Sequence, residues 1–285
     1  MRNVTKIQSL SSEGILRYAA YLRDQERSRP TIEKYLRDLR ALGGYLEGRT
    51  LTKSEMIGWK EHLSDRYAPA TVNSMLAAAN GYLAFAGMGD RRVRLLRIQR
   101  ELFARPEREL NRGEYHRLVT AADKKGDRRL ALILQTICAT GIRVSELQYI
   151  TVEAARTGYA RVDCKGKRRT VFLPQKLRQL LIRYLKNQKK TAGAVFTTRT
   201  GRPVNRSNIW REMKELCGAA GVQPEKVFPH NLRHLFARTY YLLEKDLSRL
   251  ADILGHSSVS TTRIYTAESG VVHARQMERM GLVVT

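Results

Sequence analysis

Apolar residues recur at spacings of three and four through the first hundred residues, which predicts short amphipathic helices. The clearest run spans residues 31–46, with its apolar positions at Ile32, Tyr35, Leu36, Leu39, Leu42 and Leu46. Thr31 follows Pro30 and is the expected cap of this helix. A second run, residues 72–86, follows a turn signal at 68–71 and ends at the glycines of 87–89. We therefore expect this part of the chain to be helical throughout.

The second half of the chain mixes helical patterns with short strand patterns. Residues 130–139 form an apolar run that predicts a buried helix, closed by Gly141. Residues 159–164 and 170–173 alternate like strands around a basic turn at 165–168, and residues 194–197 are a candidate third strand. Further helices are expected to begin near residues 207, 229, 247 and 258, the third of them ending at Gly255. The pattern predicts a mainly α fold with a small β-sheet.

A polar stretch interrupted by proline, residues 103–109, predicts a linker. Single hydrophobic cores stop growing at roughly 250–300 residues, so a chain of 285 residues is expected to hold two domains. We place a helical domain at residues 1–104 and a mixed α/β domain at residues 105–285.

The charge balance points to a polyanionic partner. The chain carries 52 Lys and Arg against 27 Asp and Glu, a formal net charge of +25. Such an excess is costly in self-repulsion unless a polyanion is bound, so nucleic acid is the first candidate and an anionic membrane surface the second. Residues 1–106 hold 19 basic and 11 acidic residues, and residues 107–285 hold 33 and 16. Both halves are therefore expected to touch the polyanion, as a clamp would.

Other classes of protein fit the sequence poorly. The most apolar segment, residues 130–139, falls far short of the roughly 20 residues that span a membrane. No apolar run follows the first basic residues, so no secretion signal is expected. Cys138, Cys164 and Cys217 have neither disulfide nor zinc-ligand spacing. We expect a cytoplasmic protein that uses no metal and no cofactor.

Arginines crowd residues 91–100 without an intervening acid, at Arg91, Arg92, Arg94, Arg97 and Arg100. A charge run usually forms a solvated helix face. Because no acidic residue interrupts this one, we favour contact with phosphate groups.

Four of the six histidines lie between residues 230 and 273, so a site is sought there. His230 and Arg233 are three residues apart and would share a helix face, although surface residues often have this spacing too. Arg143 directly follows a helix stop, and pairing with Glu146 is the simplest role for it. Each of these residues is uninformative alone.

Their joint order is more specific. Four segments follow one another: TGIRVSEL at 140–147, KGKRR at 165–169, HNLRH at 230–234 and LGHSSVSTTRIYT at 254–266. They resemble the tyrosine site-specific recombinases, the family that includes the phage integrases and the Xer recombinases. The last segment is the most specific, with Tyr265 nine positions after His256 across a Ser/Thr cluster. The resemblance is strong over residues 110–275, whereas residues 10–103 match only in kind, as a helical core-binding domain.

The resemblance implies a site-specific DNA recombinase that clamps DNA in a C shape between a SAM-like helical domain and a catalytic domain. A DNA phosphodiester would pass to Tyr265, giving a 3′-phosphotyrosyl link and a free 5′-hydroxyl without metal or ATP. The implied site residues are Arg143 and Arg233 for the phosphate charge, His230 as general base, Lys165 as general acid, His256 as a hydrogen-bond partner of the phosphate, and Glu146 as an orienting group.

The resemblance also implies the partners. The substrate would be double-stranded DNA with a short inverted-repeat core site, and Lys167 and Arg168 would contact it together with the arginine run. A homotetramer would form on DNA through the apolar-spaced tail, residues Val271, Val272, Met277, Met280 and Leu282. Whether a second recombinase or an accessory factor takes part is left open.

Several functions compete with this interpretation. Among recombinases, an Xer-like resolvase of chromosome or plasmid dimers is favoured over an integrase of a mobile element or virus, because no residues remain for an additional arm-binding domain. A type IB topoisomerase would relax DNA without a specific site. A DNA-binding protein without enzymatic activity, or a basic RNA-binding module, would need only the charge.

Overall fold

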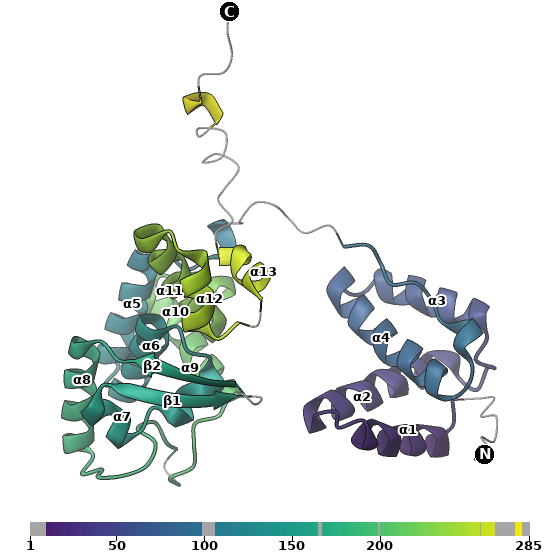
Figure 1. Cartoon of the computed structure of the whole chain (residues 1–285), viewed down its shortest axis with the longest axis horizontal. Helices are drawn as coiled ribbons and strands as arrows, with labels where there is room; N and C mark the ends of the chain where they lie inside the picture. The colour runs from purple at the N-terminus through teal and green to yellow at the C-terminus, as the bar shows by residue number, and fades with distance from the viewer. Residues whose placement is uncertain are drawn as a thin grey trace, which may run out of the picture. The chain divides into compact units, whose positions relative to one another are not determined.

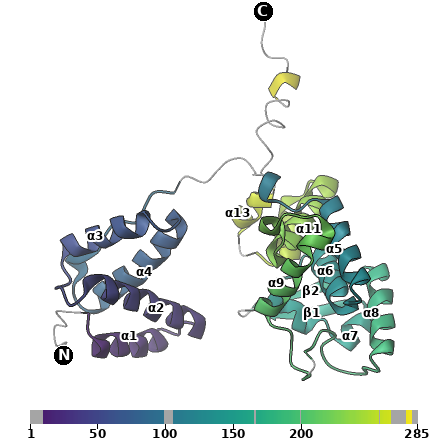
Figure 2. The same ribbon diagram turned by 180° about the vertical axis from the view of Figure 1, so that it is seen from behind.

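The computed structural model describes residues 10–98, 106–164, 167–198, 200–256, 258–265 and 277–280. The chain divides into two compact units, Met1–Arg100 and Glu101–Thr285 (Figures 1 and 2).

The first unit is a helical bundle. Its helices are α1 (Ser12–Asp24), α2 (Arg29–Leu46), α3 (Lys53–Ser64) and α4 (Pro69–Phe85), followed by the 3-10 turn η1 (Gly89–Arg91). Helix α4 buries most of its length against α2 and α3. Helix α2 begins at Arg29 after Ser28, so the prediction that Thr31 caps it was wrong. Pro30 lies in the first helical turn, where its missing N–H leaves no hydrogen bond unmade.

Most of the arginine run lies on a non-helical segment that packs against the bundle. Residues 92–98 have no helical structure. The side-chain amide of Asn80 exchanges two hydrogen bonds with the backbone of Val93, and that of Asn73 does the same with Leu96. The arginines of this segment therefore alternate with anchored positions instead of forming a solvated helix face.

The second unit is built around α6 (Arg128–Thr140), which packs against α5 (Arg112–Lys124) and α11 (Pro229–Glu244). The other helices are α7 (Val152–Thr157), α8 (Gln175–Asn187), α9 (Arg206–Glu215), α10 (Cys217–Ala220), α12 (Leu247–Leu254) and α13 (Val259–Thr262). The 3-10 turns are η2 (Pro106–Arg108), η3 (Val144–Tyr149), η4 (Pro224–Lys226) and η5 (Arg263–Tyr265). The glycine stops at Gly141 and Gly255 lie where the sequence predicts them.

The described residues form one antiparallel hairpin, β1 (Tyr159–Cys164) and β2 (Lys167–Phe172). Ala160, Val162 and Val171 turn to the core, in the period-two alternation of a half-buried sheet. Strand β2 begins three residues before the predicted start, because the basic residues there continue the pairing with β1. The predicted third strand, 194–197, was wrong, since it makes only isolated bridges to Thr151 and Pro203.

The fold is therefore mainly helical with a small sheet, as predicted. Among the described residues, no helix combines the length and the apolar character that a membrane span requires.

Candidate active site

The turn after α6 delivers Arg143. The helix ends at Thr140, and Gly141 follows with φ +66°. Residues with a Cβ adopt this left-handed backbone conformation only with strain. A Cβ on Gly141 would lie 2.4 Å from the ring of Phe236 on α11. Only glycine allows this close approach, so the glycine of the sequence motif holds the Arg143 turn against α11.

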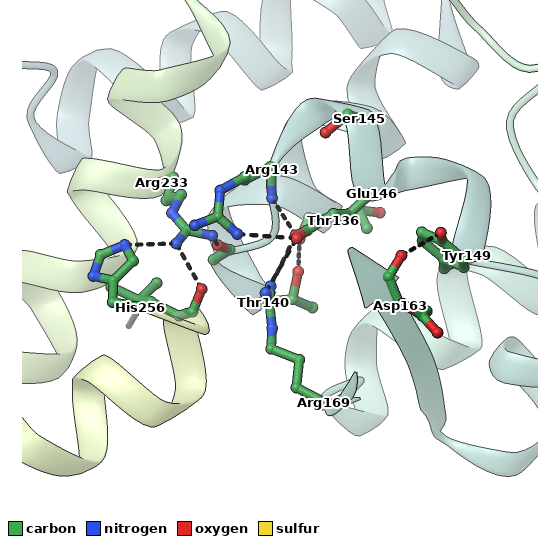
Figure 3. A network of polar contacts seen from close by, with 12 residues as sticks. Thr136, Thr140, Arg143, Ser145, Glu146, Tyr149, Asp163, Arg169, Arg233 and His256 are labelled. Atoms are coloured by element: carbon green, nitrogen blue, oxygen red, sulfur yellow. Dashed lines mark hydrogen bonds and ion pairs between the residues drawn. The ribbon is translucent and has the colours of Figure 1, made fainter. Parts of the chain in front are cut away.

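Glu146 lies in η3 and is 1% exposed. Its carboxylate accepts from the Arg143 N–H at 2.7 Å and from Arg143 Nη1 at 3.1 Å (Figure 3). It also accepts from both terminal nitrogens of Arg169, at 3.1 and 2.8 Å. Burial opposes ionisation, but the Arg143 N–H and the Arg169 guanidinium outweigh it and hold the pKa of Glu146 below its usual value. The carboxylate therefore stays charged and fixes both arginines.

Arg169 is a site residue that the sequence analysis missed. It lies on β2 opposite Val162, on the face that Val171 turns to the core. Its guanidinium fills the space over Gly255, where a Cβ would meet Nη1 at 2.6 Å. The alternation of side chains along β2 could have indicated it, because Arg169 lies two positions before the inward-facing Val171 and therefore on the same face.

Arg233 is the most deeply buried cation of the site, at 1% exposure. Nη1 donates to the carbonyl of Gly141 at 2.6 Å, and Nη2 donates to the carbonyl of Leu254 at 2.7 Å. Burial, with a contribution from the charge of Arg143, lowers the pKa of Arg233 to about 10, and Tyr265 opposes that shift. The guanidinium stays charged at neutral pH and joins the ends of α6 and α12.

His256 receives the remaining contact of Arg233. Its Nε2 lies 2.9 Å from Arg233 Nη2, and its Nδ1 lies 2.7 Å from the Thr262 hydroxyl. Because arginine can only donate, we assign Nε2 as the acceptor and the proton to Nδ1, which donates to Thr262. Burial and the neighbouring charges of Arg233 and Arg143 lower the pKa of His256 to about 4, so the ring is neutral.

Tyr265 lies at the end of η5 and is 4% exposed. Its ring stacks on His256 with centroids 5.9 Å apart and meets the edge of His234 at 4.6 Å. It packs in a small cluster with Leu250 and Leu254. Its hydroxyl interacts with the Arg233 guanidinium. The tyrosine thus reaches both α11 and α12.

His230 lies in the first turn of α11 and is exposed overall. Desolvation of its imidazole, followed by the charges of Arg233 and Arg143, lowers its pKa. Its ring lies 4.5 Å from that of His234, whose buried Nε2 has no hydrogen-bond partner. Nowhere in the described ranges do three or more His, Cys, Asp or Glu side chains form a group able to hold a metal ion.

The structure thus brings together five of the predicted site residues, Arg143, His230, Arg233, His256 and Tyr265, with Glu146 behind Arg143. Lys165 lies outside the described residues, as do Arg100 and the tail residues Val271, Val272 and Leu282. The predicted DNA-contact residue Arg168 is 90% exposed and pairs with Asp163. Arg92, Arg94 and Arg97 are exposed, whereas Arg91 donates to the carbonyl of Leu51.

The comparisons with known proteins agree with this geometry. The phage integrase family model matches residues 108–270, and the phage integrase N-terminal SAM-like domain matches residues 15–87. The chain belongs to the phage integrase family of tyrosine recombinases. This tyrosine recombinase is therefore an enzyme that breaks and rejoins DNA.

Two curated relatives are similar over most of their length. The recombinase is 32% identical to tyrosine recombinase XerD of Xanthomonas campestris, with 90% of this chain and 88% of XerD covered. It is 30% identical to tyrosine recombinase XerA of Pyrococcus furiosus, with 97% and 96% covered. Its fold resembles that of a lambda integrase tetramer bound to a Holliday junction, with a TM-score of 0.71, 17% identity, and 89% and 76% covered.

Proposed function

We propose that this tyrosine recombinase cuts and rejoins DNA by transferring a phosphodiester to Tyr265. The Tyr265 oxygen bonds to phosphorus, the bond to the 5′-oxygen breaks, and a 5′-hydroxyl leaves. The observation that carries the proposal is the contact of Tyr265 with both His256 and Arg233. The energy of the broken bond is kept in the phosphotyrosine, so a second 5′-hydroxyl can reverse the step.

The two arginines would stabilise the charge that builds on the non-bridging oxygens. Cations already in place stabilise such charge without reorganising during the reaction. The Arg143 side chain is 39% exposed and held by Glu146, so it can contact a phosphate from a fixed position. Arg233 is buried beneath it, and its charge acts at short range in a medium with little water.

His230 would take the proton of Tyr265 and return it in the ligation step. A general base must be unprotonated at the working pH. The lowered pKa of His230 meets that requirement at pH 7, and its exposed position allows it to turn toward the hydroxyl.

His256 would hydrogen-bond the phosphate after a change of tautomer. In the assigned tautomer its Nε2 accepts from Arg233 and cannot donate to an anion. Moving the proton from Nδ1 to Nε2 makes Nε2 a donor. Arg233 Nη2 must then donate to the phosphate instead of to Nε2, and Nδ1 must find a donor of its own. The Thr262 hydroxyl can reverse its role and supply that hydrogen bond, because a hydroxyl both donates and accepts.

Lys165 would protonate the leaving 5′-oxygen. This role rests on the family resemblance and on the position of Lys165 in the sequence between β1 and β2. Strand β2 is held at the site by the hydrogen bonds of Arg169 to Glu146.

Replacing Tyr265 tests the nucleophile. Tyr265→Phe should form no covalent adduct on a nicked suicide substrate while it binds the same DNA with unchanged affinity. Tyr240→Phe and Tyr241→Phe, on α11, are the matched controls and should retain the adduct. An adduct with Tyr265→Phe would overturn the assignment, and its loss in either control would make that tyrosine the next candidate.

We propose an Xer-like role, the resolution of chromosome or plasmid dimers in the cytoplasm. Support comes from the XerD and XerA relatives, of which the chain covers 88% and 96%. We assign DNA binding to residues 1–104 and catalysis to residues 105–285, on double-stranded DNA with a short inverted-repeat core site. The lambda integrase tetramer on DNA supports a tetramer as the active assembly.

A plasmid with two directly repeated copies of the host resolution site tests this role. An Xer-like enzyme should excise the intervening DNA. Recombination only between unlike sites would indicate an integrase, and relaxation of a supercoiled plasmid that lacks the site would indicate a topoisomerase.

A further inference from the structure

Three chain segments that carry proposed catalytic groups meet at one side chain, Arg169. It is the third residue of β2, four positions after Lys165. It donates to Glu146, which holds Arg143, and it packs over Gly255, which precedes His256. We infer that Arg169 is a positioning residue that holds the β1–β2 hairpin, the Arg143 turn and the His256 loop in one arrangement for DNA cleavage. This inference rests on the proposed function of Tyr265.

The placement of Arg169 is costly for folding alone. Its neighbours on the inward face of the hairpin, Ala160, Val162 and Val171, are all apolar and buried. A buried cation must be paired and hydrogen-bonded to offset the loss of its hydration. Replacing both members of such an ion pair with apolar residues of similar size often costs no stability, whereas removing one member leaves the other charge unpaired. Stability alone therefore does not require the Arg169–Glu146 pair, and a role in the site explains it better.

The contact between Arg169 and Glu146 fixes the orientation of both groups in addition to pairing their charges. Arg169 and the Glu146 carboxylate meet through two parallel hydrogen bonds of 3.1 and 2.8 Å, an arrangement that fixes both planes. The same carboxylate oxygens accept from Arg143 at 2.7 and 3.1 Å. The orientation of Arg143 is thus set by a carboxylate that is itself set by Arg169 (Figure 3).

The charge of Arg169 also keeps Glu146 ionised. The groups that face this carboxylate are Arg143 on its own turn, Arg169 on β2 and the more distant Arg233 on α11. Burial raises the pKa of Glu146, and Arg169 is among the groups that lower it. Without Arg169 the balance moves toward protonation, and a protonated Glu146 would release the Arg143 guanidinium.

Arg169→Met and Arg169→Lys test the role on the full-length enzyme, with single-turnover cleavage of a suicide substrate as the readout. Arg169→Met should cleave about 100-fold more slowly, the effect of a misplacement of about 1 Å, with DNA affinity close to wild type. Its thermal unfolding temperature should fall, because Glu146 loses a charged partner, so the rates are compared well below that temperature. Arg169→Lys should recover part of the rate, because one hydrogen bond and the charge remain. Arg161→Met is the matched control, since Arg161 lies on the exposed face of β1, and it should cleave at the wild-type rate.

The pH dependence separates positioning from packing. In Arg169→Met the cleavage rate should fall as the pH is lowered, over a range where the wild-type rate is flat, because Glu146 takes up a proton. Glu146→Gln combined with Arg169→Met should lose that pH dependence. A wild-type rate in Arg169→Met, or a rate lowered equally at every pH, would overturn the inference. Absence of a Tyr265 adduct in the wild-type enzyme would instead overturn the proposed function.

Discussion

At the scale of single residues, the hydroxyl of Thr262 can serve either tautomer of His256, because a hydroxyl both donates and accepts. Thr262 is fully buried and its hydroxyl lies 2.7 Å from Nδ1. If His256 changes tautomer during catalysis, this hydroxyl must donate in one state and accept in the other. An apolar residue of the same shape could do neither.

Thr262→Val should therefore slow single-turnover cleavage about fivefold, the equivalent of one hydrogen bond of roughly 1 kcal/mol. Thr262→Ser keeps the hydroxyl and should stay near the wild-type rate. Thr261→Val, one position earlier and exposed, is the control for the substitution itself. Equal rates for the Val and Ser variants at 262 would show that the tautomer change is not needed.

At the scale of elements, the ends of helices place the site. Gly141 ends α6 at φ +66° with the ring of Phe236 against it. Gly141→Ala should destabilise the second unit by about 1–2 kcal/mol through backbone strain and by about 1–3 kcal/mol more through the clash. It should also slow cleavage, because the Gly141 carbonyl holds Arg233. Urea unfolding and single-turnover cleavage measure the two effects.

Gly126→Ala is the matched control. Gly126 has φ +79°, but nothing lies within 4 Å of the position of a Cβ. It should show the strain alone and no loss of cleavage. Phe236→Leu should restore part of the stability of Gly141→Ala by making room. Equal destabilisation by the two glycine substitutions would contradict a role for the close approach.

The sequence predicted helix ends better than strand ends. Gly141 and Gly255 are clear helix-stop signals, because glycine readily adopts the left-handed conformation that ends a helix. The start of β2 was missed, since Lys167 and Arg168 match the pattern of a basic turn, and they join the strand with Arg169 only by pairing with β1.

The site residues were likewise predictable from local motifs, whereas the contacts between them were not. The motif gave the identity of the residues around Tyr265, but only the packing of α11 against α6 shows that Arg233 reaches the Gly141 carbonyl. Arg169 was missed because its partner, Glu146, lies 23 positions away in the chain. Contacts at that separation depend on tertiary packing, which local patterns do not report.

At the scale of the whole molecule, partly buried neutral histidines make stability depend on pH. Burial, followed by nearby charges, lowers the pKa of His234 and that of His256 to about 4. Unfolded imidazole has a pKa near 6.5, so between pH 6.5 and 4 the unfolded chain binds more protons. The free energy of unfolding should be highest above pH 6.5 and fall by about 2 kcal/mol for each imidazole at pH 5.

His234→Phe should remove one of these contributions, while His116→Phe, at an exposed position of α5, should leave the pH dependence unchanged. Fluorescence of Trp210 on α9, in a Trp59→Phe background, follows the second unit during urea unfolding at pH 7 and pH 5. The same pH dependence with and without His234 would contradict the lowered pKa.

The net charge of +25 should make DNA affinity depend steeply on salt. Arg94 and Arg97 are exposed on the segment anchored by Asn73 and Asn80. Replacing both with Gln should reduce the slope of log affinity against log salt on a nonspecific duplex by about 1.8, the value for two phosphate contacts. Replacing Arg17 and Arg23 of α1 with Gln is the control. An equal reduction by both pairs would show that the segment is not a preferred phosphate site.

The two carbonyls that hold Arg233 have an electrostatic consequence. Each belongs to the last turn of a helix or to its glycine cap, and a helix presents about half a negative charge at that end. The dipoles of α6 and α12 together balance most of one buried cation without a carboxylate. A phosphate that approaches Arg233 therefore displaces no hydrogen-bonded acidic side chain from it. The two helix ends can stay in contact with the guanidinium while it also binds the phosphate.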